Sequence, residues 1–256
     1  MILQNLSAVC IFNFMDSAIE IRNLSVVFPS RKNNVTALDN LNLKVQRGQV
    51  FGFLGPNGAG KTTTMHVLLG FISATAGEAK IFGADVSQSI ARQKIGYLPE
   101  HPDTYKFLSG RELLTMTGRL FKIGGKKLSS RIGESLDLVD MSGAADRRIA
   151  TYSRGMMQRI CLAQALINDP DLVILDEPAG GLDPIGRMDI RRIIADLKDR
   201  KKTVFFSSHE LSEVELACDH LAILARGQLI AEGPASKIIP PGENLEKYFM
   251  RVVSTP

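Results

Sequence analysis

Apolar and polar positions along the chain divide it into short strand-like and longer helix-like segments. Residues 41–45 alternate with period two, which predicts a half-buried strand. Residues 50–54 are apolar or glycine and lead into a glycine-rich loop, as expected of a buried strand in a parallel sheet. Further strands are expected at 19–28, 172–176, 203–207 and 220–225, and helices at 61–71, 153–168, 186–199, 210–218 and 245–253. This alternation predicts an α/β fold with a doubly wound sheet.

The stretch from about 100 to 150 has a different pattern. Its apolar residues recur near helical spacing, so we interpret it as a helical insertion. They are Leu113, Leu114, Leu120, Phe121, Ile132, Leu136, Leu138 and Val139.

Amino-acid composition and charge narrow the range of possible functions only slightly. The chain has 256 residues, of which 45% are hydrophobic, and a formal net charge of +4. Such an excess can favour nucleic acid or an acidic membrane surface, but no long basic block occurs, so ordinary solvated charges are the better interpretation. Cys10, Cys161 and Cys218 form no C-x-x-C pair. We therefore expect free thiols in a reducing compartment.

The beginning of the chain is uncharged over residues 1–15, which is too short to span a membrane and includes Gln4, Asn5 and Asn13. No basic residue precedes this run, which argues against a signal peptide. Met15 is an alternative start, just before the first expected strand. We treat residues 1–17 as an extension and expect a cytoplasmic protein.

A complete phosphate-binding loop follows the strand at 50–54. Residues 55–62 read Gly-Pro-Asn-Gly-Ala-Gly-Lys-Thr and match G-x-x-x-x-G-K-[ST], with a strand before and a helix after. Glycines let successive N–H groups face phosphate oxygens, and the helix start adds a positive dipole end. Lys61 would reach the β- and γ-phosphates, and the Thr62 hydroxyl would ligate Mg²⁺. A glycine turn with a surface lysine is the competing interpretation, which this context disfavours. The residues expected to bind nucleotide here are Asn57, Gly58, Ala59, Gly60, Lys61, Thr62 and Thr63.

Two carboxylates end the apolar strand at 172–175. Asp176 is expected to hold Mg²⁺, and Glu177 to accept a proton from the water that attacks the γ-phosphate. Ligands gather at the carboxyl ends of strands in open α/β sheets, which supports both roles. The alternative is that Glu177 only ends the strand at the surface.

With these motifs in order, the sequence resembles the ATP-binding-cassette (ABC) ATPases from residue 18 to about 233. The resemblance rests on Tyr-Ser-Arg-Gly-Met at 152–156, Leu-Asp-Glu-Pro at 175–178, Gly-Leu-Asp-Pro at 181–184 and Ser-Ser-His-Glu at 207–210. They are similar to the family's signature, Walker B, D-loop and H-loop. The resemblance implies an α/β phosphate-loop NTPase (RecA-like) core with an antiparallel β subdomain and an inserted helical subdomain. It also implies an ATPase domain at 18–235, with the helical subdomain at about 100–150, and a short tail at 236–256.

The same resemblance implies roles for residues outside the loop. Ser153 and Gly155 would contact the γ-phosphate held by a second subunit, so the site is completed by a dimer. Ser153 is also a natural N-cap for the helix that follows. His209 would hydrogen-bond the γ-phosphate, Asp183 would lie at the subunit interface, and Phe28 and Val35 would line the adenine pocket, although Phe28 could equally belong to the core.

Two segments depart from the family pattern. In the signature, Arg154 replaces the first glycine and Met156 the glutamine of the usual Leu-Ser-Gly-Gly-Gln, and the Arg154 side chain could complement phosphate charge or point to solvent. Glu100 stands where the family usually has the glutamine that contacts Mg²⁺ and water. A glutamate can still approach a metal, but it adds negative charge.

The resemblance favours a transporter motor that hydrolyses ATP with Mg²⁺ and works through a separate membrane permease at the cytoplasmic face of the inner membrane. Residues 96–100 and 152–156 are most similar to exporter (ABC-2-like) ATPases, so export is the expected direction. The region 100–150 would be the docking surface for the permease, and the segment near 97–108 would couple the two. The second cassette could be identical or different. A soluble cassette ATPase acting on nucleic acid or ribosomes is the alternative, but such relatives usually have a coiled coil or two fused cassettes. A regulator without catalysis would lack catalytic residues that are present here.

Overall fold

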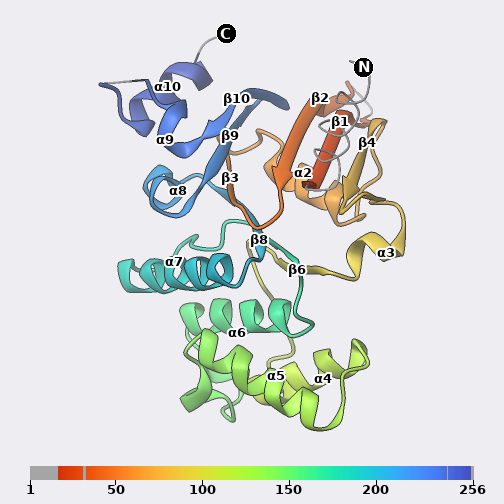
Figure 1. Ribbon diagram of the computed structural model, residues 1–256, viewed down its shortest axis with the longest axis vertical. Helices are drawn as coiled ribbons and strands as arrows, with labels where there is room; N and C mark the ends of the chain where they lie inside the picture. Colours follow the sequence, from red (N-terminus) through yellow and green to blue (C-terminus); the bar gives the residue numbers. More distant parts are fainter. Residues whose placement is uncertain (1–16, 31–32, 241, 255–256) are drawn as a thin grey trace, which may run out of the picture. The chain divides into compact units, whose positions relative to one another are not determined.

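The computed structural model describes residues 17–30, 33–240 and 242–254. The chain divides into two compact units, one built from Met1–Gln93 and His209–Pro256 and the other from Lys94–Ser208. Cys10 and all of the expected N-terminal extension except Ser17 lie outside the described residues. Figure 1 labels the elements of both units.

The first unit contains an antiparallel sheet in the order β2-β1-β4-β5. Its strands are β1 (Ser17–Phe28), β2 (Val35–Gln46), β4 (Ala76–Ile81) and β5 (Ala84–Asp85). Ile21 pairs with Leu43 and Phe28 pairs with Val35 in the β1–β2 register. The strand expected at 19–28 is present, and Ile19, Ile21 and Leu24 are buried, with an irregularity in the β1–β2 register between Ile21 and Leu24.

A second group of strands in this unit leads to the phosphate loop. Strand β3 (Val50–Leu54) is fully buried and pairs in parallel with β9 (His220–Ala225), which pairs antiparallel with β10 (Gln228–Pro234). The sequence patterns do not predict β10, because its residues are only half-buried or exposed. The helices of this unit are α2 (Lys61–Leu68), α3 (Ser89–Arg92), α8 (Leu211–Ala217), α9 (Ala235–Ile238) and α10 (Leu245–Ser254).

The second unit is built on three parallel strands with β7 in the middle. They are β6 (Ile95–Leu98), β7 (Leu172–Leu175) and β8 (Thr203–Ser208). Helix α6 (Arg154–Leu166) packs against β6, and α7 (Pro184–Asp199) packs against β8. All residues of β7 and β8 are buried, which agrees with a parallel sheet covered by helices.

Two helices occupy the stretch with the helical pattern, α4 (Gly110–Leu120) and α5 (Gly125–Leu138). Two short 3-10 turns follow, η1 (Ser142–Ala144) and η2 (Ile149–Thr151). A capping box begins α4: Ser109 Oγ accepts from the Glu112 N–H at 3.2 Å, and Glu112 accepts from the Ser109 N–H at 2.8 Å. Leu113 and Leu114 are buried, as their spacing predicts.

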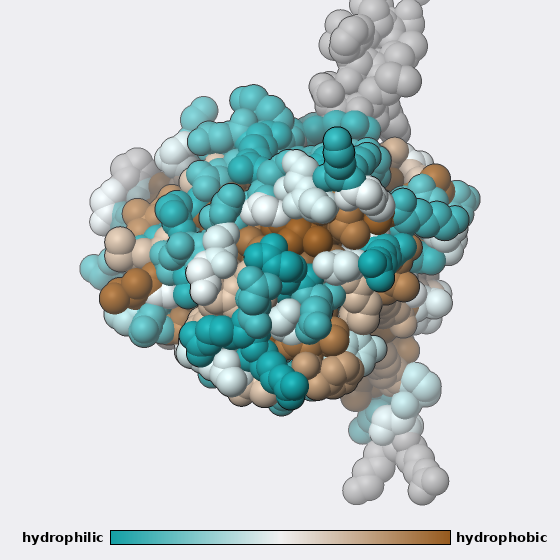
Figure 2. Space-filling model, turned by 90° about the horizontal axis from the view of Figure 1, so that it is seen from below, coloured by the Kyte–Doolittle hydropathy of each residue, from teal (hydrophilic) through white to brown (hydrophobic). Residues whose placement is uncertain are grey.

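Leu120 and Phe121 share that spacing but lie at the surface, with Leu120 76% exposed. Phe107, ahead of α4, is 68% exposed. Figure 2 looks onto the end of the second unit that holds α4 and α5, where apolar atoms appear among hydrophilic ones. Within the described ranges, no helix combines the length and apolar content that crossing a membrane requires.

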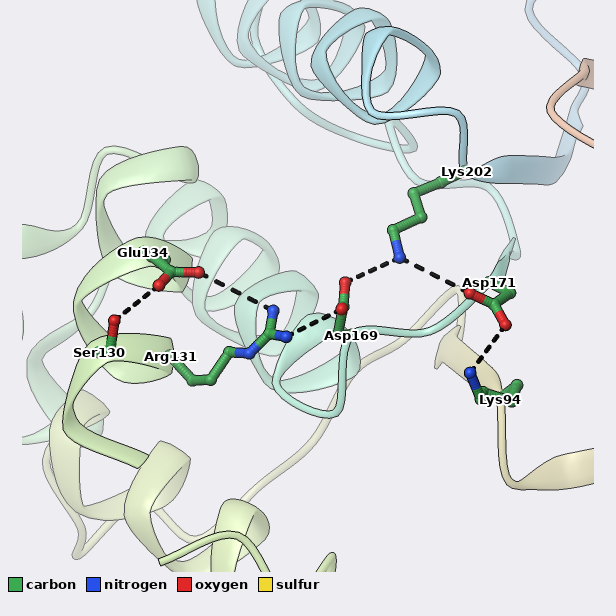
Figure 3. Close-up of polar contacts among 7 residues, drawn as sticks. All are labelled: Lys94, Ser130, Arg131, Glu134, Asp169, Asp171 and Lys202. Atoms are coloured by element: carbon green, nitrogen blue, oxygen red, sulfur yellow. Dashed lines mark hydrogen bonds and ion pairs between the residues drawn. The ribbon is translucent and has the colours of Figure 1, made fainter. Parts of the chain in front are cut away.

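A chain of ion pairs ties α5 to the segment before β7 (Figure 3). Asp169 accepts from Arg131 at 2.8 Å and from Lys202 at 2.7 Å. Asp171 in turn pairs with Lys94 at 3.0 Å. Partial burial alone would raise the pKa of Asp169, but the hydrogen bonds and charges of Lys202 and Arg131 outweigh it and hold the pKa below its ordinary value. Asp169 therefore joins three segments of the second unit through its charge.

The two described cysteines are free thiols, as expected. Cys161 is buried on α6, whereas Cys218, which follows α8, is half-buried. Burial, with a smaller contribution from the charge of Asp103, raises the pKa of Cys161 to about 12. This thiol is therefore neutral and unreactive at physiological pH.

Candidate functional site

The phosphate loop lies between β3 and α2 and is sharply curled. Gly58 has φ +78° and Gly60 has φ +107°, both in the left-handed region that favours glycine. A Cβ on Gly60 would lie 2.6 Å from the Ala37 carbonyl oxygen, so no side chain fits there. The helix that begins at Lys61 directs its first N–H groups back toward this loop. The curled loop and the helix start together form an anion-binding arrangement.

Lys61 folds over the loop that precedes it. Its ammonium donates to the Gly55 carbonyl at 2.6 Å and to the Pro56 carbonyl at 3.4 Å, and the residue is only 7% exposed. The Gly55 and Pro56 carbonyls thereby hold the positive charge of Lys61 beside the backbone N–H groups of the phosphate loop. Thr62 is exposed and Thr63 half-buried on the first turn of α2. The Thr64 hydroxyl donates a hydrogen bond to the Gly60 carbonyl at 3.0 Å.

The turn between β9 and β10 is hydrogen-bonded to the phosphate loop. The Gly227 N–H donates to the Ala59 carbonyl at 2.9 Å, and the Asp39 N–H donates to the Gly227 carbonyl at 2.9 Å. Gly227 has φ +80°, and a Cβ there would lie 2.8 Å from the Ala37 carbonyl oxygen. Two backbone hydrogen bonds therefore link β2, the Gly227 turn and the phosphate loop, which keeps the loop rigid.

The two residues expected to line an adenine pocket are cross-strand neighbours. Phe28 ends β1 and pairs with Val35 at the start of β2. Both stay at the surface, with Phe28 40% and Val35 57% exposed. An aromatic ring left at the surface beside an aliphatic side chain is suited to stacking on a flat base. This exposure argues against the alternative that Phe28 is a core residue.

Asp176 and Glu177 follow the end of β7 in the second unit, and one serine contacts both residues. Asp176 is 1% exposed, and its carboxylate accepts from the Ser207 hydroxyl at 2.6 Å. The same hydroxyl oxygen accepts from the Glu177 N–H at 2.9 Å. Ser207 is completely buried at the end of β8. Sequence reasoning assigned no separate role to Ser207, because only the pairing of β7 with β8 brings the three residues together.

Glu177 has an unusual backbone conformation. Its φ is +49°, in the left-handed region where residues with a Cβ are uncommon, and it is 7% exposed. The hydrogen bond to Ser207 on its N–H and the one from Gly180 N–H to its carbonyl, at 2.9 Å, hold this turn. Residues held in sparsely populated conformations cluster at functional sites. The surface-cap interpretation of Glu177 does not agree with its burial.

Glu100 lies two residues beyond β6, with its side chain about half exposed. Its carboxylate lies 3.6 Å from the His101 ring. Burial, followed by the negative charges of Asp176 and then Glu100, raises the pKa of Tyr97 to about 12. Both carboxylates therefore act electrostatically on the same phenol, so Glu100 and Asp176 approach the same region of the second unit.

Ser153 and Gly155 lie at the start of α6. Ser153 is the N-cap, as its residue type predicts, and its hydroxyl accepts from the Met156 N–H at 3.3 Å. Both residues line one surface hollow together with Gly181, Leu182 and Asp183. The signature-like and D-loop-like segments, which are separate in sequence, thus meet within the second unit.

Asp183 begins α7. Its carboxylate accepts from the Gly186 N–H at 2.7 Å, and Pro184 occupies the first helical position. Asp183 is also exposed at the rim of the hollow. The capping role does not use all of its acceptor capacity, because a carboxylate has two oxygens.

His209 belongs to the first unit, at the beginning of the segment that leads into α8. It is exposed and lines a hollow with Glu210, Glu215 and the start of α10, where Asn244 and Glu246 contribute. The expected C-terminal tail thus lies beside His209, which the sequence alone did not indicate.

The residues expected to hold Mg²⁺ are Thr62, Asp176 and Glu100, all oxygen donors. Oxygen ligands suit Mg²⁺, which usually takes one or two carboxylates together with substrate phosphates and water. Within the described part of the chain, no three His, Cys, Asp or Glu side chains gather into a group that could hold a metal. Thr62 belongs to the first unit, whereas Asp176 and Glu100 belong to the second.

Comparison with known proteins places this geometry in a family. A family model described as ABC transporter matches residues 38–180. An ABC transporter ATP-binding protein of Synechocystis is 46% identical over 214 residues, which are 83% of this chain and 60% of that protein. A Nod factor export ATP-binding protein of Cupriavidus metallidurans is 36% identical over 227 residues, 88% of this chain and 74% of that protein.

Solved structures agree with the fold. The ATP-binding subunit of an ABC transporter is 26% identical, with a TM-score of 0.81 over 92% of this chain and 99% of that one. The prediction of an α/β phosphate-loop fold with an antiparallel β sheet is thereby confirmed. The chain spans about 60% of the length of the Synechocystis relative. From the curled phosphate loop, the buried Asp176–Ser207 pair and these likenesses, we conclude that the chain belongs to the ABC transporter family, among its ATP-binding proteins.

Proposed function

We propose that this protein binds ATP with Mg²⁺, hydrolyses it to ADP and phosphate, and drives export through a separate membrane permease. The observation that carries the proposal is the phosphate loop, in which Gly58 and Gly60 adopt positive φ and Lys61 is fixed by the Gly55 carbonyl. The buried Asp176–Ser207–Glu177 arrangement supports hydrolysis rather than binding alone.

The site residues of the first unit divide the nucleotide between them. Phe28 stacks on the adenine, Val35 lines the adenine pocket, and the amides of residues 57–63 hold the phosphates. The Lys61 ammonium exchanges its carbonyl partners for the β- and γ-phosphate oxygens, whose negative charge attracts it more strongly. His209 donates a hydrogen bond to the γ-phosphate.

The second unit supplies the groups that act on water and metal. Asp176 and Glu100, together with Thr62 of the first unit, would hold Mg²⁺, which would neutralise charge on the β- and γ-phosphates. Glu177 orients a water molecule in line with the γ-phosphate and accepts its proton. Ser207 keeps Asp176 and Glu177 in fixed relation while this happens, so neither carboxylate needs to reorganise during the reaction.

Two subunits cooperate in the proposed cycle. Ser153 and Gly155 of one subunit close on the γ-phosphate bound by the other, and Asp183 lies at this interface. Release of phosphate removes the anionic link, and the dimer opens. The pairing partner is a second ATP-binding subunit, either identical or different.

Export is supported by the likeness to the Nod factor export protein. The permease would dock on the second unit near α4, where Phe107 and Leu120 are exposed and line one hollow together with Arg111 and Arg119. Apolar side chains surrounded by charges are typical of a protein interface. The protein would thus be held at the cytoplasmic face of the inner membrane.

Three measurements test the proposal. Phosphate release and equilibrium ATP binding are compared for the wild type and Lys61→Ala; Lys198→Ala, on α7, is the matched control. We expect Lys61→Ala to lose both activities and the control to keep them. Membranes from the native host are then fractionated, and we expect the protein to sediment with them. Equal activity in Lys61→Ala, or absence from the membrane fraction, would contradict the proposal.

A further inference from the structure

The segment between Glu177 and α7 is held by side chains rather than by a sheet or helix. Three alternate carbonyls along it accept hydrogen bonds: Pro178 from Gln158 at 3.0 Å, Gly180 from Arg154 at 3.0 Å, and Leu182 from Arg187 at 3.2 Å. These donors hold the segment together with two backbone hydrogen bonds inside it, from the Gly180 N–H to the Glu177 carbonyl and from the Leu182 N–H to the Ala179 carbonyl.

Two of the three donors stand on one face of α6. Arg154 and Gln158 are four residues apart, which places them one helical turn apart on the same side. Gln158 is buried and makes the inner attachment, whereas Arg154 is exposed and makes the outer one. The segment is thus attached at two points to the helix that Ser153 begins.

The guanidinium of Arg154 also fills the space beside Gly181. A Cβ on Gly181 would lie 2.4 Å from Nη2 and 2.5 Å from Cζ of Arg154. Gly181 has φ +66°, so glycine is favoured there by backbone and by space. A planar guanidinium can lie flat against the glycine while it donates to the Gly180 carbonyl, which an ammonium group does not reproduce.

We propose that Arg154 is a positioning residue for ATP hydrolysis, which fixes residues 178–183 to the start of α6. The proposal rests on the function proposed above, because this segment begins next to Glu177 and ends at Asp183. Through the Gly180 N–H bond to the Glu177 carbonyl, the attachment supports the turn that carries the general base. It also makes Ser153 and Asp183, which line the same hollow, move together.

This assignment differs from a direct role for Arg154 as a cation that attracts phosphate. A direct electrostatic role needs only a positive charge, so Arg154→Lys would keep it. The positioning role needs the planar fork, so Arg154→Lys and Arg154→Ala would both lose it.

Hydrogen–deuterium exchange of the full chain without nucleotide tests the attachment. We expect amides of residues 180–183 to exchange about tenfold faster in Arg154→Ala, the effect of losing one exposed charge-assisted hydrogen bond. Arg192→Ala, which removes an exposed arginine from α7, is the control and should exchange as the wild type does. Unchanged exchange in Arg154→Ala would overturn the proposal.

Steady-state phosphate release tests the consequence. We expect kcat to fall about tenfold in both Arg154→Ala and Arg154→Lys, with KM for ATP within about twofold of the wild type, because the phosphate loop is untouched. Full activity in Arg154→Lys, or a loss confined to KM, would overturn the positioning role. A wild type that does not hydrolyse ATP would instead refute the proposed function, and the two failures are therefore distinguishable.

Discussion

Replacing Ser207 by alanine removes the hydroxyl that joins the Asp176 carboxylate to the Glu177 backbone N–H. In the wild type this group donates to Asp176 at 2.6 Å and accepts from the Glu177 N–H at 2.9 Å, with no exposure to solvent. The variant loses a hydrogen bond to a charged group and leaves a buried N–H without its acceptor. Together these effects should lower the free energy of unfolding by about 2–4 kcal/mol.

The same change should slow hydrolysis more than it weakens ATP binding. Glu177 is held at φ +49° partly by the lost hydrogen bond, so its carboxylate would sample other positions. We expect kcat to fall by at least about tenfold while the Kd for ATP changes little, because the phosphate loop is unaltered.

Urea unfolding and phosphate release measure the two effects. The matched control is Ser135→Ala, which removes a buried hydroxyl from α5 and leaves both carboxylates as they are. We expect the control to stay within about 1 kcal/mol of the wild type. If Ser207→Ala matched the control in both stability and kcat, the reasoning about the serine bridge would be refuted.

Three further predictions concern other parts of the chain. Gly60→Ala should abolish ATP binding and destabilise the protein, because a Cβ would meet the Ala37 carbonyl at 2.6 Å, whereas Gly58→Ala, with φ +78° and no atom within 4 Å, should be milder; calorimetric titration and thermal unfolding compare them. Cys161 should resist alkylation at pH 8 until the protein unfolds, since its pKa is raised to about 12. Its contribution to stability should be lost as pH rises above the ordinary pKa of a thiol. Mass spectrometry of labelled peptides checks the resistance to alkylation, and labelling before unfolding would contradict it. Asp169→Asn should be less stable than the wild type at pH 7 and should lose less stability on acidification. A carboxyl whose pKa is lowered in the folded state stabilises that state at pH values above the ordinary carboxyl pKa, and this stabilisation is lost as pH falls through the folded-state pKa. Urea unfolding at pH 7 and pH 3.5 gives the comparison, and parallel pH profiles of the two proteins would count against it.

Short sequence patterns correctly predicted individual strands, loops and helix ends of this fold. The run at 50–54 forms β3, and the glycine pattern that follows it forms a loop with positive φ at Gly58 and Gly60. Helix α7 begins at Pro184, two residues before the expected start, because Asp183 caps it and proline occupies its first position.

Contacts between distant segments could not be predicted. Nothing in the sequence indicates that Ser207 joins Asp176 to Glu177, because that contact depends on the register of β7 with β8. Arg154 was expected to complement phosphate or to point to solvent; it is exposed, and its guanidinium also donates to the Gly180 carbonyl, 26 residues away, a contact that the sequence did not indicate. The carbonyl that Arg154 reaches lies directly before Gly181, which has positive φ in the folded chain.

The central claim is that Glu177 is the base in a site whose phosphate loop binds ATP independently of it. The most direct test is a parallel measurement of ATP affinity and of single-turnover hydrolysis for the wild type and Glu177→Gln. The account predicts an unchanged Kd and a hydrolysis rate lowered by about 10²–10⁴-fold, the contribution typical of a general base. Hydrolysis by Glu177→Gln at the wild-type rate would contradict it.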